Sequence, residues 1–182
     1  MSSAGMSWID AAFSLGAALK ELKREGWVRR GVRRPESVAD HSYSLALLSM
    51  LVAADRGLDP YKTAALAVVH DLAEALTGDL TPSEKKTNQD YRDEEQKAIQ
   101  EIVYRIQGRA GNLILQLYSE YSSQSSEEAR LVKELDKLEM ALQAIAYERE
   151  GRAGRGLAEE FTQSALKEIT DPEIKRKLQA KQ

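Results

Sequence analysis

The sequence predicts an all-α fold, organised as a single domain over residues 1–182. Apolar residues recur at helical spacing through nearly the whole chain, and no segment of any length alternates apolar and polar residues as a strand does. The chain has only four prolines, and its 182 residues are enough for one domain to bury a core. We therefore expect a helical bundle with a central part at about 26–147 and C-terminal helices over 156–182 packed on it.

Each helix boundary is predicted where glycine, proline or small polar residues interrupt the apolar spacing. Ser37 is the expected cap of the second helix, and Pro60 lies in the first turn of the third. Because Pro35 follows it, Arg34 should be extended. The expected helices span 8–24, 38–56, 60–77 and 89–107, a shorter one after Gly108 and Gly111 that ends near 121, then 127–149 and two short helices split at Pro172. A basic extended loop is expected between the first two helices and a polar loop at 80–88.

The net charge of −3 is unevenly distributed. Seven bases and two acids lie between Lys20 and Arg34, so the rest of the chain is clearly acidic. A short basic patch on an acidic protein favours a small anionic ligand over a nucleic acid polymer, although a solvated basic turn would have the same composition. The absence of cysteine excludes disulfides and thiolate metal sites.

Neither a membrane span nor a signal peptide is predicted. The longest nearly unbroken apolar stretch, residues 45–54, is about half the length that a membrane-spanning helix needs. The first ten residues carry no basic side chain and are interrupted by Asp10, which is unlike a signal peptide. We therefore expect a cytoplasmic protein with no membrane partner.

The two histidines are the most informative residues of the chain. His41 follows Asp40, and His70 is followed by Asp71. Imidazole with carboxylate is a recurring way to hold a divalent cation for hydrolysis. The helices that carry the histidines are joined by a short turn and should pack antiparallel, which places His41 and His70 at the same end of the pair. The alternatives are a hydrogen-bonded core histidine at 41 and a solvated one at 70.

Two further acids, Glu74 and Asp136, lie at helical positions where they could contribute to such a site. Glu74 lies one turn after His70 and on the same face of the expected helix. Asp136 lies inside a helix beside a leucine stripe, although aspartate is unfavourable in helix interiors. From the residues alone, an exposed acid paired with Lys133 or Lys137 is the favoured explanation of Asp136.

The segments GWV…RRPESVADHS at 26–42 and VHDLAEA…GDLTP at 69–82, together with Asp136, resemble the HD-domain superfamily of metal-dependent phosphohydrolases. The similarity extends over about 26–86 and 131–147 and is closest to the branch of HD-domain-containing protein 2 and the YfbR-type 5′-deoxynucleotidases. The resemblance implies a bundle of the HD-domain type that binds one divalent metal ion through His41, His70, Asp71 and Asp136. It also implies that Glu74 and Asp79 are catalytic acids beside this ion.

The substrate's phosphate would be bound by arginine on the basic segment, because the planar guanidinium suits a phosphate dianion. Arg30 and Arg33 are our candidates, ahead of Arg24 and Arg29. The YfbR-type enzymes carry arginine immediately before the tryptophan, where this chain has Gly26, so that residue has no counterpart here. Trp27 either stacks on a base or anchors its segment.

The expected function is a metal-dependent 5′-nucleotidase that releases phosphate from (deoxy)nucleoside 5′-monophosphates. Mn²⁺, Co²⁺, Fe²⁺, Ni²⁺, Zn²⁺ and Mg²⁺ are all open as the cofactor. Relatives often dimerise, so a homodimer or higher homo-oligomer is expected. One alternative is another HD hydrolase, acting on a nucleoside di- or triphosphate, a guanosine alarmone or a cyclic phosphodiester. The other is a non-catalytic helical interaction module. The chain has no Gly-rich Walker loop, which argues against an NTP-driven motor.

Overall fold

A computed structural model describes residues 7–81, 84 and 90–181, and its described part is helical throughout. The helices are α1 (Trp8–Glu21), α2 (Glu25–Arg29), α3 (Val38–Asp55), α4 (Pro60–Val69), α5 (Glu74–Thr77), α7 (Tyr91–Ile106), α8 (Gly108–Ser123), α9 (Glu127–Arg149), α10 (Leu157–Glu168) and α11 (Pro172–Gln179). Within these ranges no strand forms, so the all-α prediction is confirmed. No described helix has the length and hydropathy needed to cross a bilayer. The first six residues and most of the predicted 80–88 loop lie outside the described residues.

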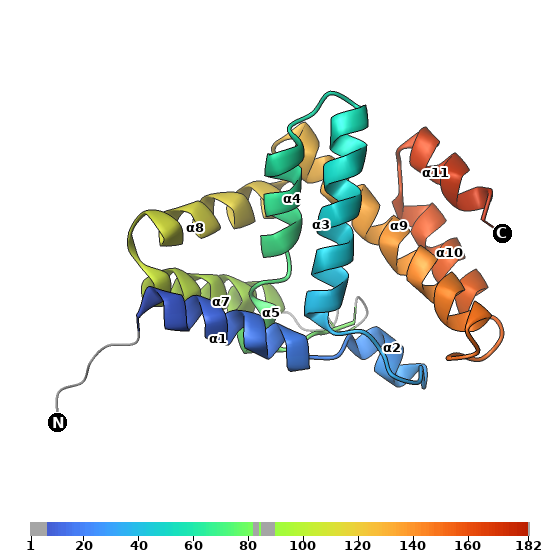
Figure 1. The fold of residues 1–182 in the computed structure, drawn as a ribbon, viewed down its shortest axis with the longest axis horizontal. Coiled ribbons are helices and arrows are strands. Elements are labelled where there is room, and N and C mark those ends of the chain that lie inside the picture. Colours follow the sequence, from blue (N-terminus) through green and yellow to red (C-terminus); the bar gives the residue numbers. More distant parts are fainter. Residues whose placement is uncertain (1–6, 82–83, 85–89, 182) are drawn as a thin grey trace.

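Helices α3, α4 and α9 form the centre of the molecule (Figure 1). Figure 1 shows α7 and α8 stacked at one end and α10 and α11 at the other. Leu45 of α3, Leu66 of α4 and Leu135 of α9 are completely buried in one shared core. Because burial of each such side chain stabilises the fold by about 1.5–3 kcal/mol, this core holds the three helices in fixed register.

The first turns of α3 and α4 are capped as the sequence predicts. The Ser37 hydroxyl accepts the backbone N–H of Asp40, and the Asp40 carboxylate accepts the N–H of Ser37 in return. Asp59 accepts two N–H groups at the start of α4, where Pro60 occupies the first turn. The Ser37 cap fixes the first turn of α3 and thereby the position of His41, which follows Asp40.

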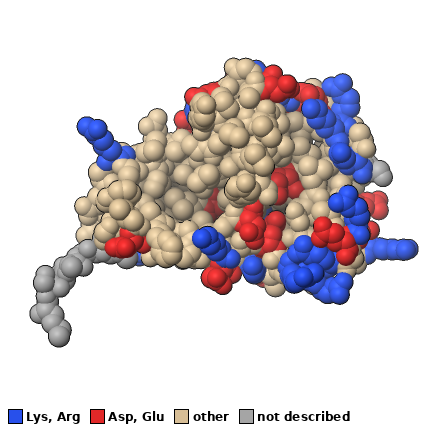
Figure 2. Space-filling view, in the orientation of Figure 1, with Lys and Arg blue, Asp and Glu red and all other residues tan. Residues whose placement is uncertain are grey.

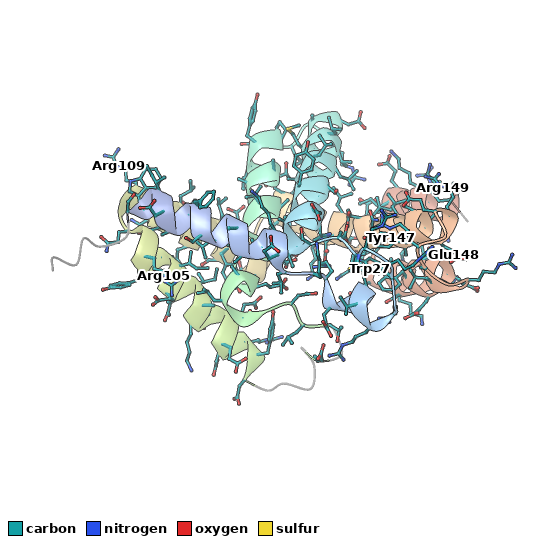
Figure 3. The ribbon with its side chains drawn as sticks, turned by 60° about the horizontal axis from the view of Figure 1, so that its bottom comes forward. Trp27, Arg105, Arg109, Tyr147, Glu148 and Arg149 are labelled. Carbon is teal, nitrogen blue, oxygen red and sulfur yellow. The ribbon has the colours of Figure 1, made fainter. Side chains whose placement is uncertain are left out.

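The basic segment is not simply an extended loop, because residues 25–29 form helix α2. Trp27 is only 2% exposed and anchors this helix: its ring packs edge-on to Tyr147 at 5.4 Å and lies 4.3 Å from Phe161 (Figure 3). Its indole N–H donates to Glu36 at 2.8 Å. Of the two interpretations of Trp27, the structure supports anchoring. The polar composition of residues 25–29 does not indicate a helix, but the contacts of Trp27 with the two aromatic rings stabilise one.

The prediction that Arg34 is extended is wrong. Arg34 has a φ of 53°, which is in the left-handed region. The guanidinium of Arg152 donates to the carbonyl oxygens of both Arg33 and Arg34. This long-range interaction fixes the turn and outweighs the local preference for extended backbone before Pro35.

The helix predicted over 60–77 is interrupted at the His-Asp pair. Helix α4 ends at Val69, residues 70–73 form turns, and α5 begins at Glu74. The N–H of Glu74 donates to the carbonyl of Asp71, three residues back, at 3.0 Å instead of to the residue four back. His70 and Glu74 are therefore not one turn apart on a continuous helix, as we had predicted.

Gly111 was predicted to help separate two helices, but it lies inside α8. A Cβ at this position would be 3.0 Å from the backbone oxygen of Val103 on α7. The glycine therefore permits close approach of α7 and α8, and the break between them falls at Gln107.

Candidate metal centre and its cleft

The two histidines lie together at one end of the α3–α4 pair. His41 is in the first turn of α3 and His70 directly follows α4, and their ring centroids are 5.4 Å apart. The two residues are 0% and 3% exposed. The antiparallel geometry expected from the short connecting turn thus brings both imidazoles to one buried point.

Each imidazole is oriented by a hydrogen bond at Nδ1. Nδ1 of His70 is 2.7 Å from the backbone oxygen of Ala67, and since a carbonyl can only accept, this nitrogen carries the proton. Nδ1 of His41 is 2.6 Å from a carboxylate oxygen of Glu139. Both Nε2 atoms are buried, and neither makes a hydrogen bond of acceptable geometry, although a carboxylate oxygen lies close to each. Fixing Nδ1 in this way leaves Nε2 as the ligand atom, as in many metal-binding histidines.

Two aspartates reach the same point. Oδ2 of Asp71 lies 2.9 Å from Nε2 of His70, and Oδ1 of Asp136 lies 3.3 Å from Nε2 of His41. Ligand atoms of His41, His70 and Asp71 all lie within 4.8 Å of one another. Asp136 is 6% exposed and 3.1 Å from Lys137, so it is a buried acid at the cluster and not the exposed surface partner of the alternative interpretation.

The electrostatics of the cluster favour a cation. Burial would raise the pKa of Asp71, but His70 and Arg24 outweigh it and hold this pKa well below its usual range. Burial and Arg24 act to lower the pKa of His41, yet Asp136 and Glu139 raise it to about 10. The buried carboxylates thus stabilise a positive charge on or beside the imidazoles. A donor set of two imidazole Nε2 atoms and two carboxylates that converge on one buried point fits a divalent transition metal.

Arg24 and Asp79 border the cluster. The guanidinium of Arg24 donates to Asp71 at 3.0 Å and lies 4.0 Å from Asp79. Asp79 also accepts the backbone N–H of Glu25, which fixes the start of α2 over the cluster. Glu74 is 1% exposed at the start of α5, and its charge acts on Arg24.

The cluster opens into a cleft of about 1160 Å³. Its walls come from α2, α7, α8, α9 and α10, and they include both charged and aromatic side chains. His70, Asp71, Asp79 and Asp136 line it, whereas His41 and Glu74 do not. The volume far exceeds that of a phosphate ion and is large enough for a nucleotide.

The two predicted substrate-binding arginines, Arg30 and Arg33, lie at different places relative to the cleft. Arg30 lines the cleft, but its guanidinium is paired with Glu160 and stacks 4.8 Å from the centre of the Phe161 ring. Arg33 does not line the cleft, and its guanidinium donates to the backbone oxygen of Gly151. The arginine nearest the cluster is Arg24, which we had placed behind both.

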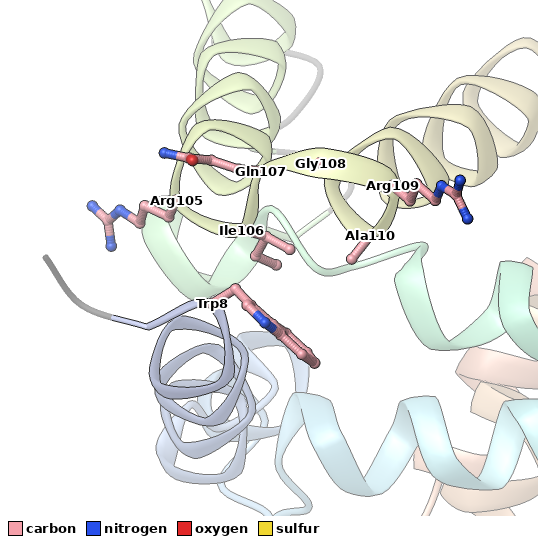
Figure 4. Close-up of a pocket in the computed structure, with 7 residues that line it drawn as sticks. All are labelled: Trp8, Arg105, Ile106, Gln107, Gly108, Arg109 and Ala110. Atoms are coloured by element: carbon pink, nitrogen blue, oxygen red, sulfur yellow. The ribbon is translucent and has the colours of Figure 1, made fainter.

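A second, smaller pocket of about 470 Å³ lies where α1 meets the α7–α8 turn (Figure 4). Trp8, Arg105, Gln107 and Arg109 are among its lining residues. None of the predicted site residues is there, so the cleft above the histidines is the better candidate.

Sequence reasoning missed Glu139 and Tyr121. Glu139 lies three residues after Asp136 on α9, so helical spacing alone places it on the same face, and this signal could have identified it. Tyr121 of α8 packs edge-on to His70, with ring centroids 5.5 Å apart. No local spacing connects Tyr121 to His70, because the contact depends on how α8 packs against α4.

Comparisons with known proteins identify the family of this chain. A family model described as "HD domain" matches residues 16–179. The 5′-deoxynucleotidase HDDC2 of Dictyostelium discoideum is 43% identical over 135 residues, which cover 70% of this chain and 71% of that protein. The 5′-deoxynucleotidase HDDC2 of Mus musculus is 39% identical over 156 residues, covering 86% and 77%. The solved structure of a conserved hypothetical protein from Pyrococcus furiosus superposes with a TM-score of 0.75 at 32% identity, covering 95% of this chain and 98% of that one.

Proposed function

This chain belongs to the HD domain family, and we propose that it is a metal-dependent phosphomonoesterase that releases phosphate from (deoxy)nucleoside 5′-monophosphates. One observation carries the proposal. The buried Nε2 atoms of His41 and His70 face Asp136 and Asp71, and three of these four residues line a cleft large enough for a nucleotide. The relatives named 5′-deoxynucleotidase supply the substrate class.

The proposed ligands of one divalent ion are His41, His70, Asp71 and Asp136. When bound, such an ion supplies Lewis acidity toward a phosphoryl oxygen and an attacking water. Its identity is open among Mn²⁺, Co²⁺, Fe²⁺, Ni²⁺, Zn²⁺ and Mg²⁺.

Two acids are the proposed proton carriers. Asp79 lines the cleft, where its carboxylate can orient the attacking water and accept its proton. Glu74, which is buried at the start of α5 and acts electrostatically on Arg24, is the second proposed acid. Arg24 would bind the phosphate at the cluster, and Arg30 would contribute after releasing Glu160. Arg33 is not among the proposed phosphate-binding residues, because it does not line the cleft and its guanidinium donates to the backbone oxygen of Gly151.

The decisive experiment is a screen of phosphate release. Purified protein is stripped of metal, reloaded with each candidate ion and incubated with nucleoside and deoxynucleoside 5′-monophosphates. We expect orthophosphate as the sole inorganic product, and Asp136→Asn should lose both metal and activity by at least 100-fold while remaining folded. Glu127→Gln, an exposed acid on the same helix, is the matched control. Release of no phosphate from any of these monophosphates, with any of the metals, would contradict the proposal.

The oligomer is proposed to be a homodimer that packs through α3. Tyr43, Leu47 and Leu51 lie on successive turns of α3 and are 72%, 45% and 58% exposed. Figure 2 shows few charged side chains over α4 and the middle of α3, whereas acidic side chains lie near the lower end of α3 and charges of both signs lie along α1. The middle of this face is therefore where two copies can meet with the least like-charge repulsion. Light scattering coupled to gel filtration should give a dimer for the wild type and a monomer for Leu47→Glu. A monomeric wild type at micromolar concentration would rule this out.

A further inference from the structure

Most positive side chains close to the candidate metal centre are already engaged by acids. Arg24 is bound to Asp71, and Lys137 lies 3.1 Å from Asp136. Arg29 and Arg30 on α2 are paired with carboxylates as well. A phosphate that bound to any of these groups would first have to break or share an ion pair, which offsets much of the gain.

Lys133 is different. It lines the cleft, and no carboxylate oxygen in the described part of the chain lies within 4.0 Å of its ammonium. It lies three residues before Asp136 on α9, so the two side chains share a face of that helix. A cation on the wall of the cleft, one turn from a proposed metal ligand, is therefore free to accept an anion.

Tyr121 holds this lysine toward the centre. The ammonium of Lys133 lies 5.7 Å from the centre of the Tyr121 ring, which is within the range of a cation–π contact. The same ring packs edge-on to His70 at 5.5 Å, and Tyr121 is 8% exposed. Unlike an ion pair, this contact does not neutralise the charge, so the ammonium can still donate to an anion. Lys133, Tyr121 and His70 thus form one continuous wall from the open cleft to the metal centre.

We propose that Lys133, on α9, binds the phosphate of the substrate. This inference rests on the proposed function, because it assigns a residue to the same substrate. It adds to the arginines of the basic segment an anion-binding group on a helix that the charge pattern did not single out. Tyr121 is a positioning residue in this arrangement.

The main test separates binding from turnover. Loss of a charge-assisted hydrogen bond worth about 1.5–3 kcal/mol corresponds to a rise in KM of roughly 10- to 100-fold. We expect this for Lys133→Met with kcat changed less than threefold, and partial recovery for Lys133→Arg. Lys97→Met, an exposed lysine of α7 that does not line the cleft, is the matched control. Tyr121→Phe should behave as wild type, whereas Tyr121→Leu should raise KM about threefold because the ring is lost.

A binding measurement keeps this inference separate from the proposed function. Titration of the metal-loaded protein with inorganic phosphate should show about tenfold weaker binding for Lys133→Met than for wild type. If the wild type binds phosphate but turns over no nucleotide, the proposed function fails and the role of Lys133 is still measured. Unchanged KM and unchanged phosphate affinity in Lys133→Met would overturn the proposal. A rise in KM for Arg92→Met but not for Lys133→Met would also overturn the proposal. Arg92 is the relevant comparison because it too lines the cleft without a described acidic partner.

Discussion

A carboxylate oxygen of Glu139 lies 2.6 Å from Nδ1 of His41, and both residues are buried. This contact fixes which imidazole nitrogen faces the candidate metal centre. Outer hydrogen-bond partners of this kind tune metal affinity nearly as strongly as the ligands themselves.

Glu139→Gln is therefore expected to weaken metal binding by about 10- to 100-fold, because the amide is a neutral and weaker partner for the imidazole N–H. Titration of metal-free protein with Co²⁺, followed in the visible spectrum, measures the change. Glu127→Gln on the same helix should leave the affinity as it is. An equal affinity for both variants would show that Glu139 has no orienting role.

Replacement of Trp27 should separate packing from hydrogen bonding. Trp27→Phe keeps an aromatic ring against Tyr147 but removes the donor to Glu36, and we expect a loss of about 1–3 kcal/mol in the free energy of unfolding. Trp27→Ala should cost about 3–5 kcal/mol, because it also empties the site. Urea unfolding measures both variants. Equal losses for the two would mean that the ring itself adds nothing.

The ion pairs at the start of α11 predict a dependence of stability on pH. Arg56 donates to Asp171 at 2.6 Å, and this hydrogen bond lowers the pKa of that carboxyl below its ordinary value of 3.8. Because the folded pKa is below the unfolded pKa, the stabilisation is complete above pH 3.8 and is lost as the pH falls through the folded pKa.

Asp171→Asn keeps an oxygen to cap α11 but loses the charge. We expect it to be less stable than wild type by up to about 1 kcal/mol at pH 7, since the pair is partly exposed. The difference should shrink in unfolding curves recorded below pH 4. A difference that stays constant from pH 7 to pH 3 would exclude the charge as its cause.

Gln107 adopts a backbone conformation that normally requires glycine. Its φ is 59° and its ψ is 175°, at the turn between α7 and α8 that Figure 4 shows. Strain of this kind costs about 1–3 kcal/mol, so Gln107→Gly should raise the stability by about 1 kcal/mol after the entropy cost of glycine. Gln124→Gly, at an ordinary left-handed helix end, is the comparison and should gain less. Thermal unfolding that ranks the two variants in reverse order would contradict this reasoning.

The sequence was sufficient where local and periodic signals agree. The Ser37 cap, the start of α4 at Pro60 and the joint position of His41 and His70 follow from spacing and capping residues alone. The break after His70 was missed because Leu72 and Leu76 continue the apolar spacing through the turn. The apolar spacing predicts which face of a helix is buried. It does not predict where a buried polar cluster interrupts the helix with a tighter turn.

The remaining differences come from long-range contacts. Arg34 is held in a left-handed conformation by Arg152, which is far away along the chain. Arg24 ranked low from sequence because nothing near it in the chain indicates that α2 would place it beside Asp71. A basic residue that is already paired with an acid is less available to a ligand. Many of these pairs form only when the helices pack, so the sequence does not show which basic residues stay free.

The chain has two tryptophans in contrasting surroundings, and this gives the molecule a built-in optical reporter. Trp8 is 57% exposed at the far end of α1, whereas Trp27 is 2% exposed in the wall of the cleft. Iodide should therefore quench only part of the emission, and in Trp8→Phe the residual blue-shifted fluorescence would come from Trp27 alone. Its intensity would then follow occupancy of the cleft in real time, without any label.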